Sequence, residues 1–223
     1  FDAAKLLPAS ALRKSGTHLP EASELEVVRH FTRLSQQNFC VDTNFYPLGS
    51  CTMKYNPKVN DQITAWPFYS RIHPYQDESQ VQGMLEIIRE LENQLSEILG
   101  MDAFSLQPAA GAHGEFAGLL MVSAYHKANG QKRTQVLVPD SAHGTNPASA
   151  ALCGYEVVQV KTDAKGRVDL ADLRSKVSPL TACFMLTNPN TLGIFETNIK
   201  EVTQIVHQAG GQVYYDGANM NAL

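Results

Sequence analysis

Four short segments of this chain place polar residues where a strand is expected to end. Asp216 comes directly after Gln212–Tyr215, a run that reads as a buried strand. His143 lies in the segment at 139–148, and the segment at 187–193 reads T-N-P-N-T-L-G. The segment at 107–115 reads Q-P-A-A-G-A-H-G-E. Ligands of open α/β sheets bind just outside the carboxyl ends of the strands, so these four segments form the candidate site.

Each segment suits one part of a charged aromatic ligand. Free backbone N–H groups and the helix dipole after the glycine segment favour a phosphate. An imidazole such as His143 can stack on an aromatic ring or relay a proton. The amides and hydroxyls at 187–193 can donate to an anionic oxygen, and Asp216 can pair with a protonated ring nitrogen. Pyridoxal phosphate carries such groups, and its pyridinium ring acts as an electron sink.

Each segment also has an ordinary structural interpretation. Glycines relieve strain in a tight turn, and Asn-Pro is a common turn signal. His143 can simply hydrogen-bond its own turn, and Asp216 can be a plain loop carboxylate. Neither G-x-G-x-x-G nor G-x-x-x-x-G-K-[ST] occurs, so a Rossmann or P-loop site is not supported. The order of the segments, one at each expected strand end, favours the cofactor site.

Hydrophobic periodicity from residue 103 onward predicts alternating strands and helices. Strands are expected at 103–106, 135–138, 156–160, 182–186 and 212–215, and helices at 112–128, 146–153, 169–176 and 198–209. Alternation at this spacing indicates parallel βαβ units, that is, an α/β fold with a mostly parallel sheet and helices on both faces. The carboxyl ends of parallel strands would bring the four segments to one sheet edge.

The N-terminal third has a different character. Residues 1–20 read as an extended arm and 21–37 as a helix. Residues 38–76 are rich in proline and aromatic residues with little periodicity, which predicts a long functional loop. A helix is expected at 77–99, with Gly100 at its end. We therefore expect an N-terminal part at 1–76 and a partial cofactor-binding large domain at 77–223.

Composition excludes several classes of function. A net charge of -4 from 18 basic and 22 acidic residues gives no nucleic-acid footprint. The apolar runs are far shorter than the ~20 residues that cross a bilayer, so no membrane is expected, and nothing at the start resembles a signal peptide. The four cysteines have no metal-type spacing. Cys153 and Cys183 lie in apolar surroundings, which fits reduced thiols and a cytoplasmic location.

The order of the four segments resembles the large domain of the fold-type-I pyridoxal-phosphate enzymes. A long string narrows this resemblance: N-F-Y-P-L-G-S-C-T-M-K-Y-N-P at 44–57. Further matching strings stand at 28–35, 107–115, 141–148 and 216–222. Together they resemble the glycine dehydrogenase (decarboxylating) family, the P-proteins of the glycine cleavage system. The second subunit of the split bacterial form is the most similar branch, and the resemblance covers nearly the whole chain.

The resemblance implies roles for matched residues around the cofactor. Ala112, His113 and Gly114 would lie around its phosphate. His143 would stack on the pyridine ring as a catalytic residue, and Ala218 would pack near the other face of the ring.

Further matched residues would contact the polar atoms of the cofactor or the incoming substrate. Thr187 or Asn188 would reach the phenolic oxygen or the substrate, and Asp216 would pair with the ring nitrogen. Residues 44–76 are expected to line the entry for a carrier arm, with the candidates Tyr46, Ser50, Cys51 and Lys54. Cys51 is either a redox-sensitive thiol or an unreactive buried one.

The implied reaction is decarboxylation of glycine, with transfer of the aminomethyl group to the lipoyl arm of H-protein. The implied partners are lipoylated H-protein and P-protein subunit 1, in a heterotetramer. The family's Schiff-base lysine follows the D-G-A-N motif, and no lysine follows Asp216 here. We therefore expect a large domain truncated before that lysine, and a chain that is inactive by itself. A non-catalytic scaffold subunit and another fold-type-I enzyme stay open as alternatives.

Overall fold

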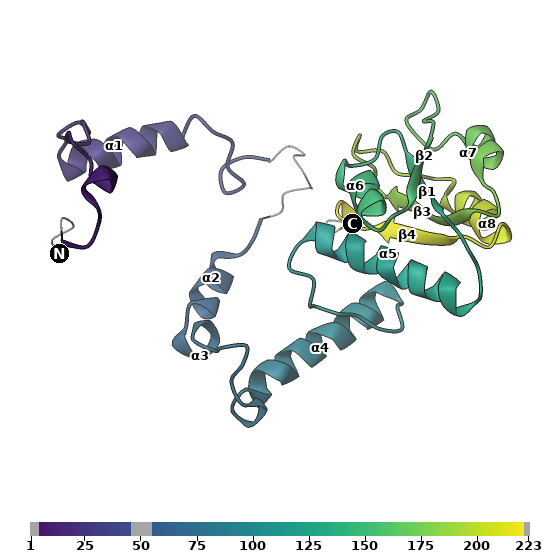
Figure 1. Cartoon of the computed structure of the whole chain (residues 1–223), viewed down its shortest axis with the longest axis horizontal. Coiled ribbons are helices and arrows are strands. Elements are labelled where there is room, and N and C mark those ends of the chain that lie inside the picture. The colour runs from purple at the N-terminus through teal and green to yellow at the C-terminus, as the bar shows by residue number, and fades with distance from the viewer. Residues whose placement is uncertain (1–4, 46–54, 221–223) are drawn as a thin grey trace. The chain divides into compact units, whose positions relative to one another are not determined.

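The computed structural model describes residues 5–45 and 55–220 and divides the chain into two units, Phe1–Phe45 and Tyr46–Leu223 (Figure 1). The first unit contains a short 3-10 turn, η2 (Ala9–Ala11), and one helix, α1 (Glu24–Ser35). Ser23 and Glu26 form a reciprocal capping box that starts α1. The helix expected at 21–37 is confirmed. The expected division at residue 76 stays a prediction.

The second unit begins with short helices where a long loop was expected. Helices α2 (Lys58–Thr64) and α3 (Pro67–Ser70) lie within the 38–76 segment, so the prediction of a loop is wrong there. Proline at the first position of α3 starts a helix without any hydrophobic repeat. Then follow the 3-10 turn η3 (Glu78–Gln80) and α4 (Gln82–Leu99), which ends at Gly100 in the left-handed conformation, as expected.

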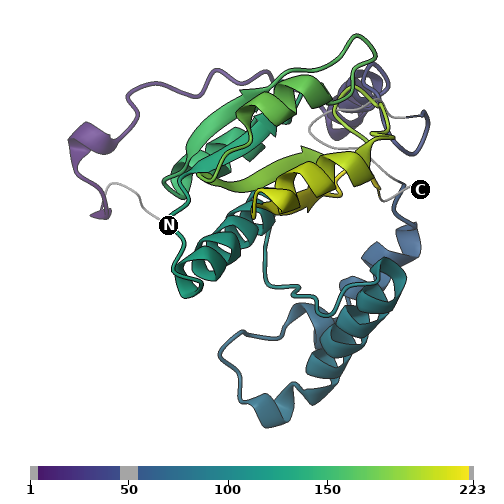
Figure 2. The same cartoon turned by 90° about the vertical axis from the view of Figure 1, so that its right-hand side faces the viewer.

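A parallel sheet forms the centre of the second unit (Figures 1 and 2). Its strands are β1 (Gln135–Pro139), β2 (Glu156–Val160), β3 (Thr181–Thr187) and β4 (Gln212–Asp216), in the order β2-β1-β3-β4. All three pairings are parallel, as expected. The strand expected at 103–106 is wrong, because that segment is irregular in the structure. Three apolar residues in a four-residue segment are too few to distinguish a strand from an irregular segment.

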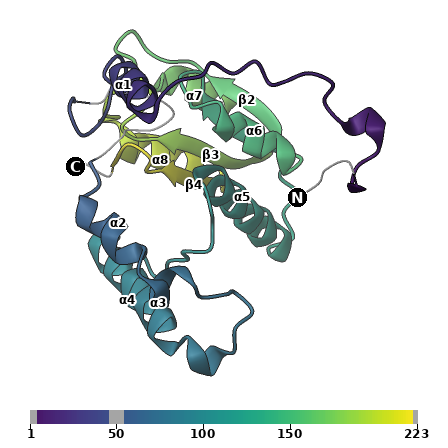
Figure 3. The same cartoon turned by 90° about the vertical axis from the view of Figure 1, so that its left-hand side faces the viewer.

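Helices cover both faces of the sheet (Figures 1 and 3). Helices α5 (Gly111–Ala128) and α6 (Thr145–Leu152) lie on one face, and α7 (Leu170–Lys176) and α8 (Ile199–Gln208) on the other. Strand β3 is buried throughout and alternates between the two layers. Cys183 and Met185 pack toward α5 and α6, whereas Phe184 and Leu186 pack toward α7 and α8. The fold places the loops after β1, β3 and β4 at one edge.

No helix in residues 5–45 and 55–220 is long and apolar enough to cross a membrane. The cysteines in this described part, Cys40, Cys153 and Cys183, form no disulfide. Burial raises the pKa of Cys183 to about 12 and also raises the pKa of Cys153, so neither thiol is primed for nucleophilic chemistry.

Candidate functional site

A cavity of about 510 Å³ lies where β1, β3 and β4 end. Residues from all four segments singled out in the sequence line this cavity, so the fold brings the segments together. They are Gly111, Ala112, Gly114 and Glu115 from α5, His143 and Thr145 after β1, Thr187 and Thr191 from the end of β3 onward, and Tyr214, Asp216, Gly217, Ala218 and Asn219 at the end of β4.

The start of α5 offers free backbone donors to the cavity. Ala110, in an extended conformation, precedes the helix and supplies no side-chain cap. The N–H groups of His113 and Gly114 both point at the Ala110 carbonyl oxygen, at 3.0 and 3.2 Å. The N–H groups of Gly111 and Ala112 have no hydrogen-bond partner in the described part of the chain. With the positive end of an 18-residue helix behind them, these donors favour an anion.

Two glycines keep the space in front of α5 open. A methyl group built on Gly111 or Gly114 would meet nothing within 4 Å. Both residues line the cavity. Packing therefore does not require glycine at either position, and the absence of side chains leaves the backbone there open to a ligand.

Asp216 is held at the end of β4 by two donors. Its Oδ1 accepts the Ala218 N–H at 3.0 Å, and its Oδ2 accepts from Asn146 Nδ2 at 3.2 Å. Asn146 is fully buried on α6, and its Oδ1 accepts from Thr187 Oγ1 at 3.4 Å. The carboxylate that the sequence singled out is thus oriented from α6 and from its own loop. The Asp216 carboxylate is therefore already oriented to pair with a positively charged group in the cavity.

His143 belongs to a chain of side-chain hydrogen bonds. Its Nδ1 lies 2.7 Å from Thr145 Oγ1, which donates to Glu115 Oε1 at 2.7 Å. Ser149 Oγ donates to the other carboxylate oxygen of Glu115 at 2.9 Å. Glu115 and Ser149 are both buried. Helices α5 and α6 are therefore joined through polar side chains directly beneath the cavity.

Tyr214 supplies a phenol to the cavity wall. Burial, together with the negative charges of Asp216 and Glu115, raises the pKa of Tyr214 to about 12. The hydroxyl therefore stays protonated at neutral pH and is available as a donor. A methyl group on Gly118 of α5 would lie 2.6 Å from Tyr214 Cε2, so glycine is required there for the ring to fit.

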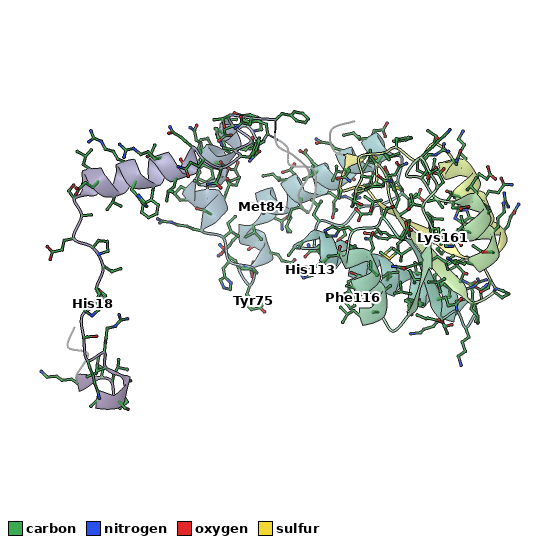
Figure 4. The ribbon with its side chains drawn as sticks, turned by 90° about the horizontal axis from the view of Figure 1, so that it is seen from above. His18, Tyr75, Met84, His113, Phe116 and Lys161 are labelled. Carbon is green, nitrogen blue, oxygen red and sulfur yellow. The ribbon has the colours of Figure 1, made fainter. Side chains whose placement is uncertain are left out.

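Six residues expected at the cofactor do line the cavity: Ala112, Gly114, His143, Thr187, Asp216 and Ala218. His113 lies on the first turn of α5, where Figure 4 labels it, but it is exposed and does not line the cavity. Asn188 is buried, and its Oδ1 accepts the Glu196 N–H at 2.9 Å. The cofactor roles of all eight residues stay predictions.

The expected entry residues Tyr46, Ser50, Cys51 and Lys54 lie outside the described residues. Sequence reasoning gave no role in the site to Glu115, Thr145, Asn146 or Tyr214. It expected Thr145 or Asn146 only to cap the short helix, which is wrong, because Gly144 is at the N-cap of α6 and no side chain caps it. Glu115, Thr145 and Asn146 stand in strings that were recognised, 107–115 and 141–148, but their contacts span 30 residues or more along the chain (Thr145 to Glu115 and Asn146 to Asp216). No spacing rule links them, because the fold alone brings them together.

A family model and several relatives match the part of the chain that forms this cavity. The family model for aminotransferase class-V matches residues 112–221, from the first turn of α5 to just beyond β4. The probable glycine dehydrogenase (decarboxylating) subunit 2 of Listeria welshimeri is 60% identical over 213 residues, 95% of this chain and 44% of that protein. The same-named protein of Bacillus licheniformis is 58% identical over 223 residues, 100% of this chain and 46% of that protein.

The chain is homologous to glycine dehydrogenase (decarboxylating) subunit 2. The resemblance seen in the sequence is thereby confirmed over nearly the whole chain. The chain spans less than half the length of these curated relatives.

Solved structures show the same fold. A glycine decarboxylase (P-protein) of the glycine cleavage system, in inhibitor-bound form, superposes with a TM-score of 0.67 at 24% identity, over 94% of this chain and 46% of that chain. A sphingosine-1-phosphate lyase of Burkholderia pseudomallei superposes with a TM-score of 0.64 at 16% identity, over 93% of this chain and 49% of that chain. The expected α/β fold, with fold-type-I pyridoxal-phosphate enzymes as structural neighbours, is confirmed.

Proposed function

We propose that this chain is the cofactor-binding part of a pyridoxal-phosphate-dependent glycine dehydrogenase (decarboxylating). The whole protein would decarboxylate glycine and pass the aminomethyl group to the lipoyl arm of H-protein. One observation carries the proposal: a helix start with free backbone N–H groups and a hydrogen-bonded carboxylate, Asp216, line the same cavity. The homology to proteins named glycine dehydrogenase (decarboxylating) supports glycine as the substrate.

The donor set of the cavity fits pyridoxal phosphate. The open start of α5, with the free amides of Gly111 and Ala112, suits the phosphate. Asp216 suits the protonated ring nitrogen. The cavity volume of about 510 Å³ falls in the range of about 300–1,000 Å³ typical of small-molecule sites. When bound, the cofactor supplies a sink for the electrons that remain after CO₂ leaves.

Each side chain of the cavity then has a task that follows from its contacts. Asp216 keeps a proton on the ring nitrogen, because a nearby negative charge favours the charged form. Asn146 and the Ala218 N–H hold that carboxylate in place. Tyr214 offers a hydroxyl donor to an anionic oxygen, and His143 would cover the ring. The Thr187 hydroxyl already donates to Asn146 Oδ1 and helps to hold that side chain.

The partners are proposed from the homology. The name "subunit 2" of the relatives favours a subunit 1 partner. The lipoyl arm would enter past Tyr46, Ser50, Cys51 and Lys54. Replacing Tyr46 or Lys54 in the intact enzyme should alter the kinetics with H-protein, and unchanged carrier kinetics would count against this entry.

Release of labelled CO₂ from carboxyl-labelled glycine tests the function. The intact protein is assayed with pyridoxal phosphate, subunit 1 and lipoylated H-protein. Asp216→Asn should lower the rate by about 10²–10³-fold, as for loss of one preorganised electrostatic contact. Asp140→Asn is a matched control, because Asp140 is exposed, bonds Thr162 and does not line the cavity. A wild-type protein that binds the cofactor yet releases no CO₂ would contradict the proposal and favour a scaffold or another substrate.

A further inference from the structure

We propose that Glu115, acting through Thr145, is a positioning residue that fixes the proton of His143 on Nδ1. The other ring nitrogen, Nε2, is then the one with a free lone pair and accepts protons in the cavity. The inference rests on the proposed function for the identity of the ligand that His143 faces. Its geometry and its test need no ligand.

The argument begins with the single hydrogen of the Thr145 hydroxyl. Thr145 Oγ1 lies 2.7 Å from Glu115 Oε1 and 2.7 Å from His143 Nδ1. A hydroxyl donates one hydrogen bond and accepts others through its lone pairs. It therefore donates to only one of these two neighbours, and the other neighbour must donate to it.

The surroundings of Glu115 decide the direction. As a carboxylate, Glu115 accepts hydrogen bonds and donates none. Thr145 reaches one of its oxygens and Ser149, at 2.9 Å, the other. With both hydroxyls donating to Glu115, the oxygen of Thr145 presents only lone pairs to His143. Nδ1 must then carry a hydrogen for the 2.7 Å contact to be a bond.

One contact competes with this assignment. The Thr145 N–H lies 3.4 Å from His143 Nδ1 and would require a lone pair there. That separation is beyond the usual N–H donor distances of about 2.7–3.2 Å. The 2.7 Å contact with the hydroxyl is much the shorter and determines the proton position.

Burial gives Glu115 a further effect on His143. Only 5% of Glu115 is exposed, and no ion pair joins it to a cation in residues 55–220. A buried carboxylate is costly unless donors satisfy it, which explains the two hydroxyls. Glu115 acts on His143 through the Thr145 hydroxyl, which lies 2.7 Å from Glu115 Oε1 and 2.7 Å from His143 Nδ1. This arrangement orients the His143 ring, in the manner in which a buried carboxylate orients a catalytic histidine.

Nitrogen-15 NMR of the His143 ring in the intact, cofactor-free protein tests the proposal. The wild-type ring should show a protonated Nδ1 and an unprotonated Nε2. Thr145→Val removes the hydroxyl and should shift the ring toward the Nε2–H form. Thr145→Ser retains the hydroxyl and should restore the wild-type signals. Ser149→Ala is the matched control, because it removes the other bond to Glu115 and should leave the His143 signals unchanged.

Two results would overturn the proposal. One is a wild-type ring that carries its proton on Nε2, a measurement that needs no variant to fold. The other is a folded Thr145→Val protein with the wild-type signals. Failure of CO₂ release with the expected ring signals would contradict the proposed function and leave the positioning role standing. Normal CO₂ release with a ring that carries its proton on Nε2 would contradict the positioning role and leave the proposed function standing.

Discussion

At the scale of single residues, the cavity combines groups that are costly to bury with donors that satisfy them. Glu115 accepts two hydroxyls, and Asp216 accepts an amide side chain and a backbone N–H. The negative charges of Asp216 and Glu115 both contribute to the raised pKa of Tyr214. Such clustering of charged groups with a perturbed phenol in one cavity is typical of functional sites.

The phenol of Tyr214 gives a pH-dependent prediction. Its pKa in the folded protein is about 12, above the value of about 10 of an unfolded chain. The stability contributed by a raised pKa is fully present below pH 10 and is lost as the pH rises toward 12. Tyr214→Phe should therefore lose stability less steeply than wild type above pH 10. Urea midpoints at pH 8, 10 and 11 measure this, with Tyr125→Phe, an exposed tyrosine, as control. Parallel curves for wild type and Tyr214→Phe would refute the expectation.

Two glycines of α5 give a paired prediction. Gly118→Ala places a methyl group 2.6 Å from the Tyr214 ring and should destabilise the protein by about 1–3 kcal/mol, the usual cost of overpacking. Gly114→Ala meets open space and should leave the urea midpoint nearly unchanged. The same methyl group projects into the cavity and should weaken binding of pyridoxal phosphate. Equal loss of stability in the two variants would show that the Tyr214 ring moves aside freely.

At the scale of elements, both ends of α5 have a structural role. Its start offers free amides to the cavity, and its last turn fastens the opposite edge of the sheet. There the buried His126 lies 2.7 Å from Gln131 Oε1 through Nδ1 and 2.9 Å from the Ala182 carbonyl oxygen through Nε2. Arg133 Nη1 donates to the carbonyl oxygens of Thr181 and Ala209. These contacts fix α5 against β3 and so fix where its open start lies.

His126→Ala should therefore destabilise the protein strongly. The substitution leaves the buried Ala182 carbonyl without its His126 partner, at about 1–3 kcal/mol for one unsatisfied buried group, whereas Gln131 Oε1 keeps its hydrogen bond from Arg133 Nε. His207→Ala on α8 is the control, because His207 is exposed. Urea unfolding measures both, and cofactor affinity should fall along with stability if α5 loses its position. A His126→Ala protein as stable as the control would show that water replaces the ring.

At the scale of the whole molecule, a central buried strand holds the two layers together. Every residue of β3 is buried, and alternate side chains enter the two hydrophobic clusters. The site lies at the end of this strand and of its neighbours β1 and β4, where backbone is released from the sheet. Rigid strands thus position the loops that carry the chemistry.

Phe184 tests the coupling between core and site. It is fully buried among the side chains of α7 and α8, on the face opposite α5. Phe184→Ala should cost about 3–5 kcal/mol through lost burial and the cavity left behind. Phe195→Ala removes the same atoms from a residue that is 52% exposed and should cost far less. Thermal and urea unfolding of the intact protein compare them, and similar losses would show that β3 is not the stabilising centre.

The sequence by itself determined most of the elements and the composition of the site. Strands β1 to β4 and helices α5 to α8 lie within two residues of their expected bounds, because hydrophobic periodicity and glycine stops are local signals. The glycine segment, His143, Thr187 and Asp216 were recognised because each was expected at the end of a strand, although the glycine segment in fact follows the irregular segment at 103–106 and opens α5. The irregular segment at 103–106 and the short helices α2 and α3 were misjudged, since their patterns are too brief to carry a period.

Only the tertiary structure decided which side chains meet. In the fold with strand order β2-β1-β3-β4, Asn146 is hydrogen-bonded to Asp216, which is 70 residues away in the sequence. Thr145 is hydrogen-bonded to Glu115, which is 30 residues away. In the folded chain His113 is exposed, whereas its neighbours Ala112 and Gly114 line the cavity. Hydrophobic periodicity in the sequence indicates whether a residue is buried, but not which side chains it contacts. Contacts between elements follow from the order and direction of the strands, and only the folded chain fixes these.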